Sequence, residues 1–162
     1  MLCIIARELL YDHKRPLWIA FSRRAKLHCM KGKRHTLTGT VVRGRGYGQK
    51  LGFPTANIDR EEWAKREPNL RLGVYAGTAE LLDTNTVYRA GIVLGPLDET
   101  GFPKIEAHLL DFSGVLYGRS VRLSFINYLR PFISFADEKE LKGQIKKDLA
   151  EVRKHVSLEF DD

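Results

Sequence analysis

The stretch that decides the fold is Gly39-Thr-Val-Val-Arg-Gly-Arg-Gly-Tyr-Gly-Gln-Lys-Leu-Gly-Phe-Pro-Thr-Ala-Asn-Ile58. Its first part continues a run from Thr36 that is rich in β-branched residues, which predicts a strand ending in a glycine-rich loop. Glycine leaves backbone N–H groups unshielded and adopts positive φ, as a loop folded over phosphates requires, although plain turns use glycine too. No Gly-Lys-Ser or Gly-Lys-Thr follows to make a P-loop, and no helix follows to make a dinucleotide site.

The residues directly after this loop are Pro54, Thr55, Ala56 and Asn57. The Thr55 hydroxyl and the Asn57 side-chain carbonyl are two residues apart, so they point the same way on an extended segment. They can offer hard oxygen ligands to a magnesium ion beside phosphates, and Pro54 would stiffen the approach. From spacing alone, an ordinary turn in which both side chains bond the local backbone explains the pattern equally well.

Four further strands are predicted after this stretch, at residues 73–82, 86–94, 104–112 and 121–125. The first two are separated by Asp83-Thr-Asn85, which indicates a hairpin. In the third, the two-residue period places Glu106 and His108 on the face opposite Ile105 and Ala107. Five or six strands at short spacing indicate a barrel or a sandwich.

One long helix comes last. Asp137 is a candidate N-cap with Glu140 as its capping-box partner, and apolar residues then recur at helical spacing, at Leu141, Ile145, Leu149, Val152 and Val156. This stripe predicts a face that packs on the core. A shorter helix is expected over residues 60–66, with Trp63 packing inward.

The charge is concentrated at one end of the chain. The 162 residues suit one domain and carry 27 Lys and Arg against 20 Asp and Glu, a net charge of +7. Residues 1–35 hold nine of these cations and two of the anions, so they carry the whole excess, and residues 36–162 are neutral. We therefore expect a basic N-terminal extension, 1–35, followed by a domain over 36–162.

Three interpretations of the extension stay open. It is a plain basic extension, a mitochondrial-type presequence, or an arm that binds nucleic acid through cations interleaved with Tyr11, Trp18 and Phe21. Its longest apolar run, Met1 to Ala6, is too short for a membrane span or a secretory signal, and two cysteines cannot make a disulfide framework. We expect a cytoplasmic monomer that is not associated with membranes.

These motifs together resemble the flavokinase (riboflavin kinase) family of the ATP-using kind. The family pattern is Gly-x-Val-x-x-Gly, then Gly, then Leu-Gly-x-Pro-Thr-Ala-Asn. The resemblance continues in the same order through residues 73–75, 105–112, 116–118, 129–131 and the terminal helix, and covers about residues 36–156. It implies a mainly all-β fold, a six-stranded antiparallel barrel with a C-terminal helix, which agrees with the strands predicted above.

The resemblance also implies a reaction and its residues. The γ-phosphate of ATP would pass to the 5′-hydroxyl of riboflavin, giving FMN and ADP, with Mg²⁺ as the cofactor. Thr55 and Asn57 match the residues that hold the magnesium and the phosphates, Glu106 matches the general base, and Arg130 matches a position near the flavin. The expected nucleotide-binding residues are completed by Gly44, Gly46, Gly48, Gly52 and Pro54. Without the resemblance, Glu106 would be interpreted as a solvent-facing strand residue, and His108 is left out of the chemistry.

The chain departs from the family in two places. The turn over residues 94–103 keeps only Gly95 and Pro96 of the usual Asn-Pro-Thr-Phe-like flap, and Phe132 replaces the usual Glu. The extension is far too short for a nucleotidylyltransferase half, so FAD synthesis is not expected. The alternative function is a flavin-binding regulatory module with weak or no kinase activity, whose residues 1–35 bind RNA. A barrel that binds an unrelated nucleotide is the third possibility.

Overall fold

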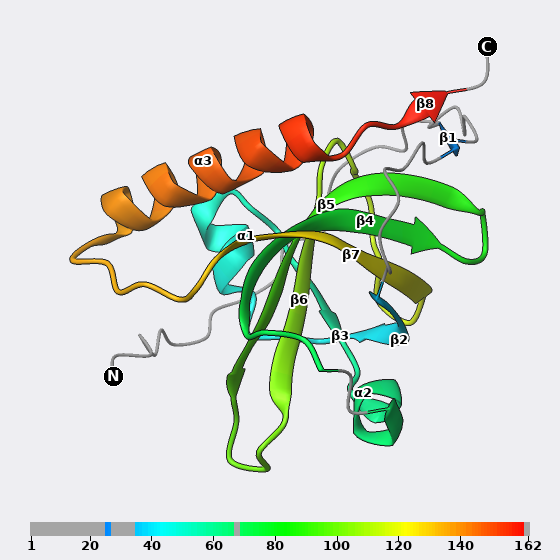
Figure 1. Ribbon diagram of the computed structural model, residues 1–162, viewed down its shortest axis with the longest axis horizontal. Helices are drawn as coiled ribbons and strands as arrows, with labels where there is room; N and C mark the ends of the chain where they lie inside the picture. Colours follow the sequence, from blue (N-terminus) through cyan, green and yellow to red (C-terminus); the bar gives the residue numbers. More distant parts are fainter. Residues whose placement is uncertain (1–24, 27–34, 67–68, 161–162) are drawn as a thin grey trace.

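The computed structural model describes residues 25–26, 35–66 and 69–160, and its main feature is a closed antiparallel β-barrel (Figure 1). Six strands close it in the order β2-β3-β6-β5-β4-β7. They are β2 (His35–Val42), β3 (Ala56–Ile58), β4 (Gly73–Leu81), β5 (Thr86–Leu97), β6 (Pro103–Leu109) and β7 (Ser120–Arg130). The predicted fold class, a six-stranded barrel with a C-terminal helix, is confirmed.

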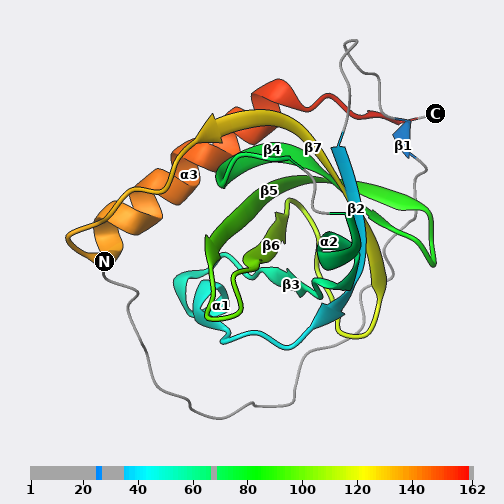
Figure 2. The same ribbon diagram turned by 60° about the horizontal axis from the view of Figure 1, so that its bottom comes forward.

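Apolar residues fill the barrel by simple alternation along the strands. Figure 2 looks into the ring of strands. In β6, Ile105, Ala107 and Leu109 are buried in the core, and the residues between them are only half-buried. Each fully buried leucine or isoleucine contributes roughly 1.5–3 kcal/mol of transfer free energy. The half-buried face of β6 is therefore free to line a site on the outside of the barrel.

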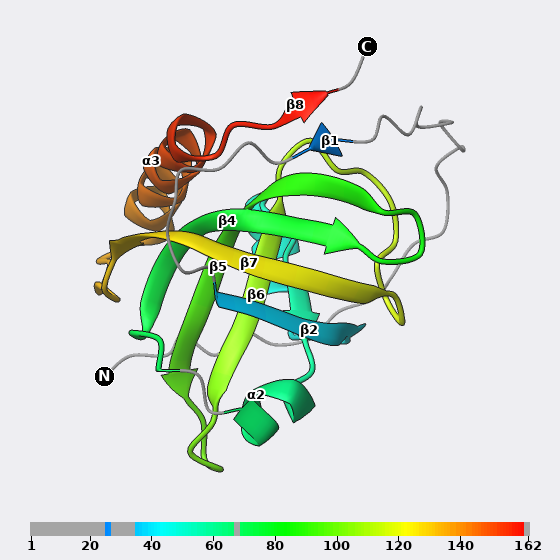
Figure 3. The ribbon, with the colours of Figure 1, turned by 45° about the vertical axis from the view of Figure 1, so that its right-hand side comes forward.

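The helix α3 (Glu138–His155) packs across the outside of the barrel against β4, β5 and β7 (Figure 3). The predicted N-cap is confirmed, because the Asp137 side chain accepts a hydrogen bond from the Glu140 backbone N–H at 2.8 Å. Val152 and Val156 of the predicted apolar stripe are buried, together with Ala76 of β4. Gly91 of β5 lies beneath α3, and a Cβ there would stand 3.2 Å from Leu149 Cδ2.

Two short helices lie between the first barrel strands. The helix α2 (Glu61–Arg66) matches the prediction, and Trp63 is 7% exposed within the core. The helix α1 (Tyr47–Leu51), inside the glycine-rich loop, was not predicted. Gly46 precedes it and Gly52 follows it, both with left-handed φ (68° and 89°), so the expected positive φ is found at these two glycines.

Outside the barrel, β1 (Ala25–Lys26) pairs with β8 (Glu159–Phe160). The nucleic-acid-binding residues suggested for the extension, Tyr11, Trp18 and Phe21, lie outside the described residues, so the domain boundary near residue 35 stays a prediction. Within the described part of the chain, no helix is long and apolar enough to cross a membrane.

Candidate active site

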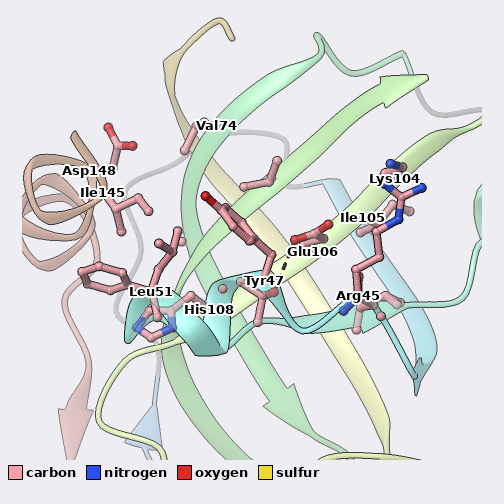
Figure 4. A pocket seen from close by; sticks show the side chains of 18 of the residues that line it. Arg45, Tyr47, Leu51, Val74, Lys104, Ile105, Glu106, His108, Ile145 and Asp148 are labelled. Carbon is pink, nitrogen blue, oxygen red and sulfur yellow. Dashed lines mark hydrogen bonds between the residues drawn. The ribbon is translucent and has the colours of Figure 1, made fainter. Parts of the chain in front are cut away.

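A cavity of about 570 Å³ lies between the glycine-rich loop, β6 and the inner face of α3 (Figure 4). Pockets of roughly 300–1,000 Å³ are typical of small-molecule sites. The loop contributes Gly44, Gly46 and Gly48 to its wall. The half-buried face of β6 forms its floor with Lys104, Glu106 and His108.

Thr55, Asn57 and Glu106 meet in this cavity. Asn57 of β3 is paired directly with Glu106 of β6, and residues opposite each other in an antiparallel pair point to the same face. The Thr55 hydroxyl donates a hydrogen bond to Glu106 Oε2 at 3.3 Å. The three side chains predicted to carry the chemistry thus come from β6, from β3 and from the residue directly before β3, and Glu106 points into the cavity (Figure 4).

These three side chains offer oxygen ligands of the kind Mg²⁺ prefers. No group of three His, Cys, Asp or Glu that could cage a metal occurs in the described residues. Magnesium, however, usually keeps several waters and is held by one or two protein oxygens together with substrate phosphates. The Thr55 and Asn57 oxygens beside the Glu106 carboxylate fit that mode of binding.

Two of the predicted glycines are required because other groups pack against them. A Cβ on Gly44 would stand 2.0 Å from Asn57 Nδ2, and one on Gly48 would stand 2.5 Å from the Phe53 carbonyl oxygen. Gly52 and Pro54 do not line the cavity. Gly52 caps α1, its N–H bonding the Gln49 carbonyl at 3.1 Å.

The loop side of the cavity is cationic. Arg43, Arg45 and Lys104 line it, and Figure 4 shows Arg45 and Lys104 close together beyond Glu106. Over residues 25–26, 35–66 and 69–160, neither Arg45 nor Lys104 has an ion-pair partner, which leaves both charges available to a polyanion. Sequence reasoning missed all three. Lys104 had a signal, because it lies two residues before Glu106 and therefore on the same face.

Another part of the cavity wall is apolar. Phe132 and Ile133, after β7, are 41% and 47% exposed, and both line the cavity with Ile145 and Leu149 of α3. Exposed apolar groups gathered at a cavity are typical of a ligand-binding surface. In Figure 4, Glu106 lies between Ile145 and the two cations Arg45 and Lys104.

Arg130, predicted to lie near the flavin, is in the cavity wall but is held by α3. Its Nε and Nη2 donate to the Asp148 carboxylate at 2.9 and 2.6 Å, and the side chains of the pair are 19% and 12% exposed. Gln144 Nε2 donates to the same carboxylate at 2.8 Å. This bidentate pair ties β7 to α3, and ligand binding by Arg130 stays a prediction.

A hydrogen bond joins α1 to α3. The Tyr47 hydroxyl donates to Glu138 Oε1 at 3.3 Å, and Tyr47 lines the cavity. Burial raises the pKa of the Tyr47 phenol above its usual value, so the hydroxyl keeps the proton that it donates.

An ion pair and a backbone hydrogen bond hold the altered turn between β5 and β6. Arg60 pairs with Asp98, and the Asp98 N–H donates to the Phe102 carbonyl at 2.9 Å. The Thr100 hydroxyl, followed by the Arg60 guanidinium, holds the pKa of the Asp98 carboxyl well below its usual value. Arg60 therefore connects this turn to the start of α2, and Arg60 and Asp98 both line the cavity.

The barrel has a cavity whose wall combines cationic side chains, a carboxylate and apolar side chains, the groups that a site for a polyanion and an apolar ligand requires. The family model described as "Flavokinase: Riboflavin kinase" matches residues 31–156. The chain belongs to the riboflavin kinase family.

Relatives with known names support the same family. Over 126 residues, 75% of this chain and 51% of the relative, the sequence is 34% identical to "RNA-binding riboflavin kinase RibR" of Bacillus subtilis (strain 168). Over 124 residues, 74% of this chain and 79% of the relative, it is 30% identical to "Riboflavin kinase" of Homo sapiens. The first curated relatives that the chain matches are longer proteins, of which it spans 37% and 51%.

A solved structure has the same fold. The crystal structure of riboflavin kinase from Trypanosoma brucei superimposes with a TM-score of 0.54 at 25% sequence identity. The superposition covers 77% of this chain and 81% of that chain.

Proposed function

We propose that this protein is an ATP-dependent riboflavin kinase, which transfers the γ-phosphate of ATP to the 5′-hydroxyl of riboflavin and releases FMN and ADP. The observation that carries the proposal is Glu106, paired opposite Asn57 and hydrogen-bonded to Thr55 in a cavity with one cationic and one apolar side. Family membership supplies the substrates.

In the proposed reaction the residues mainly align groups and neutralise charge, which is what phosphoryl transfer asks of a protein. Arg45 and Lys104 offset the charge of the triphosphate, and Phe132 and Ile133 contact the flavin ring. The glycine-rich loop, with Gly44, Gly46 and Gly48, wraps the phosphates.

Glu106 is the proposed general base. Its carboxylate takes the proton of the 5′-hydroxyl as that oxygen attacks the γ-phosphorus. The bond from the γ-phosphorus to the bridging oxygen breaks, and ADP leaves with the electron pair. Mg²⁺, held by Thr55 and Asn57, would neutralise charge on the phosphates when bound.

An assay of FMN formation from riboflavin and Mg-ATP tests the proposal with two glutamine variants. Glu106→Gln should lower kcat about 10²- to 10⁴-fold, since a positioned base contributes that much. Glu80→Gln is the matched control, because Glu80 is also a strand glutamate but pairs with Arg122 and does not line the cavity. Wild-type turnover no greater than that of Glu106→Gln would contradict the catalytic role.

We further propose that the protein acts in the cytoplasm as a monomer, since its proposed substrates are soluble and the described residues of one chain bring the carboxylate, the cations and the apolar groups together. Light scattering at working concentration tests the monomer. The RNA-binding alternative has less support: one relative carries RNA binding in its name, but the matched region spans only 51% of it. Filter binding of RNA would support that alternative if affinity fell steeply with salt and depended on residues 1–35.

A further inference from the structure

His108 lies on the same face of β6 as Glu106, and the catalytic proposal gives it no role. Its Nδ1 lies 2.7 Å from the Pro54 carbonyl oxygen. Its ring meets Phe53 edge-on, with centroids 6.0 Å apart and an interplanar angle of 78°. His108 therefore contacts both residues that precede Thr55.

The hydrogen bond to Pro54 determines which nitrogen of the His108 imidazole carries the proton. A backbone carbonyl can only accept, so Nδ1 must carry the proton. Pro54 directly precedes Thr55, and the β3 ladder begins only at Ala56. The carbonyl of Pro54 consequently receives its donor from a side chain on β6 rather than from the sheet.

The same segment is held from its other side by the glycine-rich loop. The Phe53 N–H donates to the Gly48 carbonyl at 2.8 Å. A Cβ on Gly48 would meet the Phe53 carbonyl at 2.5 Å and Thr55 Oγ1 at 3.3 Å, so the loop packs closely on Phe53 and Thr55. Residues 53–55 thus lie between Gly48 and His108, with Thr55 facing Glu106.

We propose that His108 is a positioning residue, whose Nδ1–H holds the Pro54 carbonyl and thereby keeps the Thr55 hydroxyl against Glu106. This inference rests on the proposed kinase function, in which Thr55 and Glu106 act together. His108 passes no proton to the substrate in this role.

Two substitutions separate the donor from the ring. His108→Asn keeps an N–H at the atom bonded to Cγ, close to the place of Nδ1, but removes the ring. His108→Phe keeps a ring against Phe53 but removes the donor. We expect His108→Phe to lower kcat about 10- to 100-fold, as loss of an orienting hydrogen bond does, and His108→Asn to stay within about threefold of wild type.

The Michaelis constants and the thermal midpoint show whether a loss of kcat in these two variants has a cause other than the lost hydrogen bond. The KM for riboflavin should change less than about twofold in both variants, since the hydrogen bond orients the phosphate-binding residue Thr55. A His108→Phe variant as active as wild type, with His108→Asn impaired, would show that ring packing matters and would overturn the proposal. Equal losses in both, with lowered thermal midpoints, would overturn it too, because the role would then be structural.

An NMR measurement tests the hydrogen bond of His108 without depending on kinase activity. Two-bond ¹H–¹⁵N correlation spectra of the ligand-free protein, recorded at a pH where the ring is neutral, show which nitrogen carries the proton. The His108 signals are assigned by their absence in His108→Asn. We expect the Nδ1–H tautomer. The Thr55 amide signal should shift in His108→Phe and stay near its wild-type position in His108→Asn. An Nε2–H tautomer would overturn the proposal even in a fully active kinase, and a protein without kinase activity could still show the Nδ1–H tautomer.

Discussion

At the scale of single residues, Gly44 controls the position of Asn57. A Cβ at Gly44 would lie 2.0 to 2.5 Å from three atoms of the Asn57 side chain, so Gly44→Ala must push that side chain out of place. We expect at least about a tenfold loss of kcat, since a displacement near 1 Å can cost about 100-fold. Steady-state assays of FMN formation measure this loss.

Gly118→Ala is the control for Gly44→Ala. Gly118 has φ of +76° and no atom within 4 Å of an added Cβ, and it does not line the cavity. Its substitution should cost about 1 kcal/mol or more of unfolding free energy through backbone strain while kcat stays at the wild-type value. If Gly44→Ala loses stability but not activity, the packing of Asn57 does not matter for catalysis.

Asp98 makes the stability of the protein depend on pH in the acid range. Thr100 and Arg60 lower the pKa of its carboxyl, so the folded protein favours the ionised form. The resulting stabilisation is complete above the unfolded value of about 3.9 and is lost as the pH falls toward the lower folded value. Asp98→Asn should therefore be less stable than wild type near pH 7, and the difference should shrink below about pH 4. Urea unfolding at several pH values measures it, and a difference independent of pH would contradict the ionic role.

The site residues predicted from sequence are those with a local motif. Thr55 and Asn57 follow the glycine-rich loop directly, and alternation alone turned Glu106 away from the core. The contact of His108 with Pro54 depends on the pairing of β3 with β6, which joins residues about 50 positions apart. Sequence periodicity contains no information on that pairing, so the sequence alone assigns His108 no role in the chemistry.

At the scale of elements, two glycines of contrasting surroundings test how helix and strand tolerate a methyl group. Gly143 is exposed in α3 with no atom within 4 Å of an added Cβ. Gly143→Ala should raise the unfolding free energy by about 0.5–1 kcal/mol and the thermal midpoint by roughly 2–4 °C. Gly77→Ala in β4 should do the reverse, because its Cβ would lie 2.2 Å from the Ser124 carbonyl oxygen. Calorimetry of both variants checks the two signs, and the same sign in both would contradict the packing.

The elements whose apolar residues recur with a clear helical or strand period were predicted. The others were missed because no such period shows in their sequence. The helix α3 has its cap and its apolar stripe, and β4, β5 and β6 have alternation or long β-rich runs. The helix α1 spans only five residues between two left-handed glycines, too short for a period to show. The strand β7 continues to Arg130, beyond the predicted end at residue 125, because register shifts against β4 interrupt its alternation.

At the scale of the whole molecule, charge and catalysis are separate along the chain. Among the residues that the structure describes, those that line the cavity fall between Val42 and Leu149, in the neutral part, whereas the net charge of +7 belongs to residues 1–35. The proposed boundary near residue 35 also lies at the start of β2. If that boundary is correct, the chain from His35 to Asp162 contains the complete barrel and α3 and should fold and catalyse alone.

We therefore expect the chain from residue 35 onward to keep kcat and both KM values within about twofold. The part of the extension that the structure describes, β1, lies against β8 and β5 and does not line the cavity. Its retention on a polyanion column should fall sharply, because contacts to a polyanion release counterions in proportion to the cations involved. Full-length protein and a variant with the extension's Lys and Arg changed to Gln are the comparisons. The charge-neutralised variant should elute with the shortened chain and keep full activity. Loss of turnover in the shortened chain but not in the neutralised variant would place the extension in the catalytic domain and overturn the boundary.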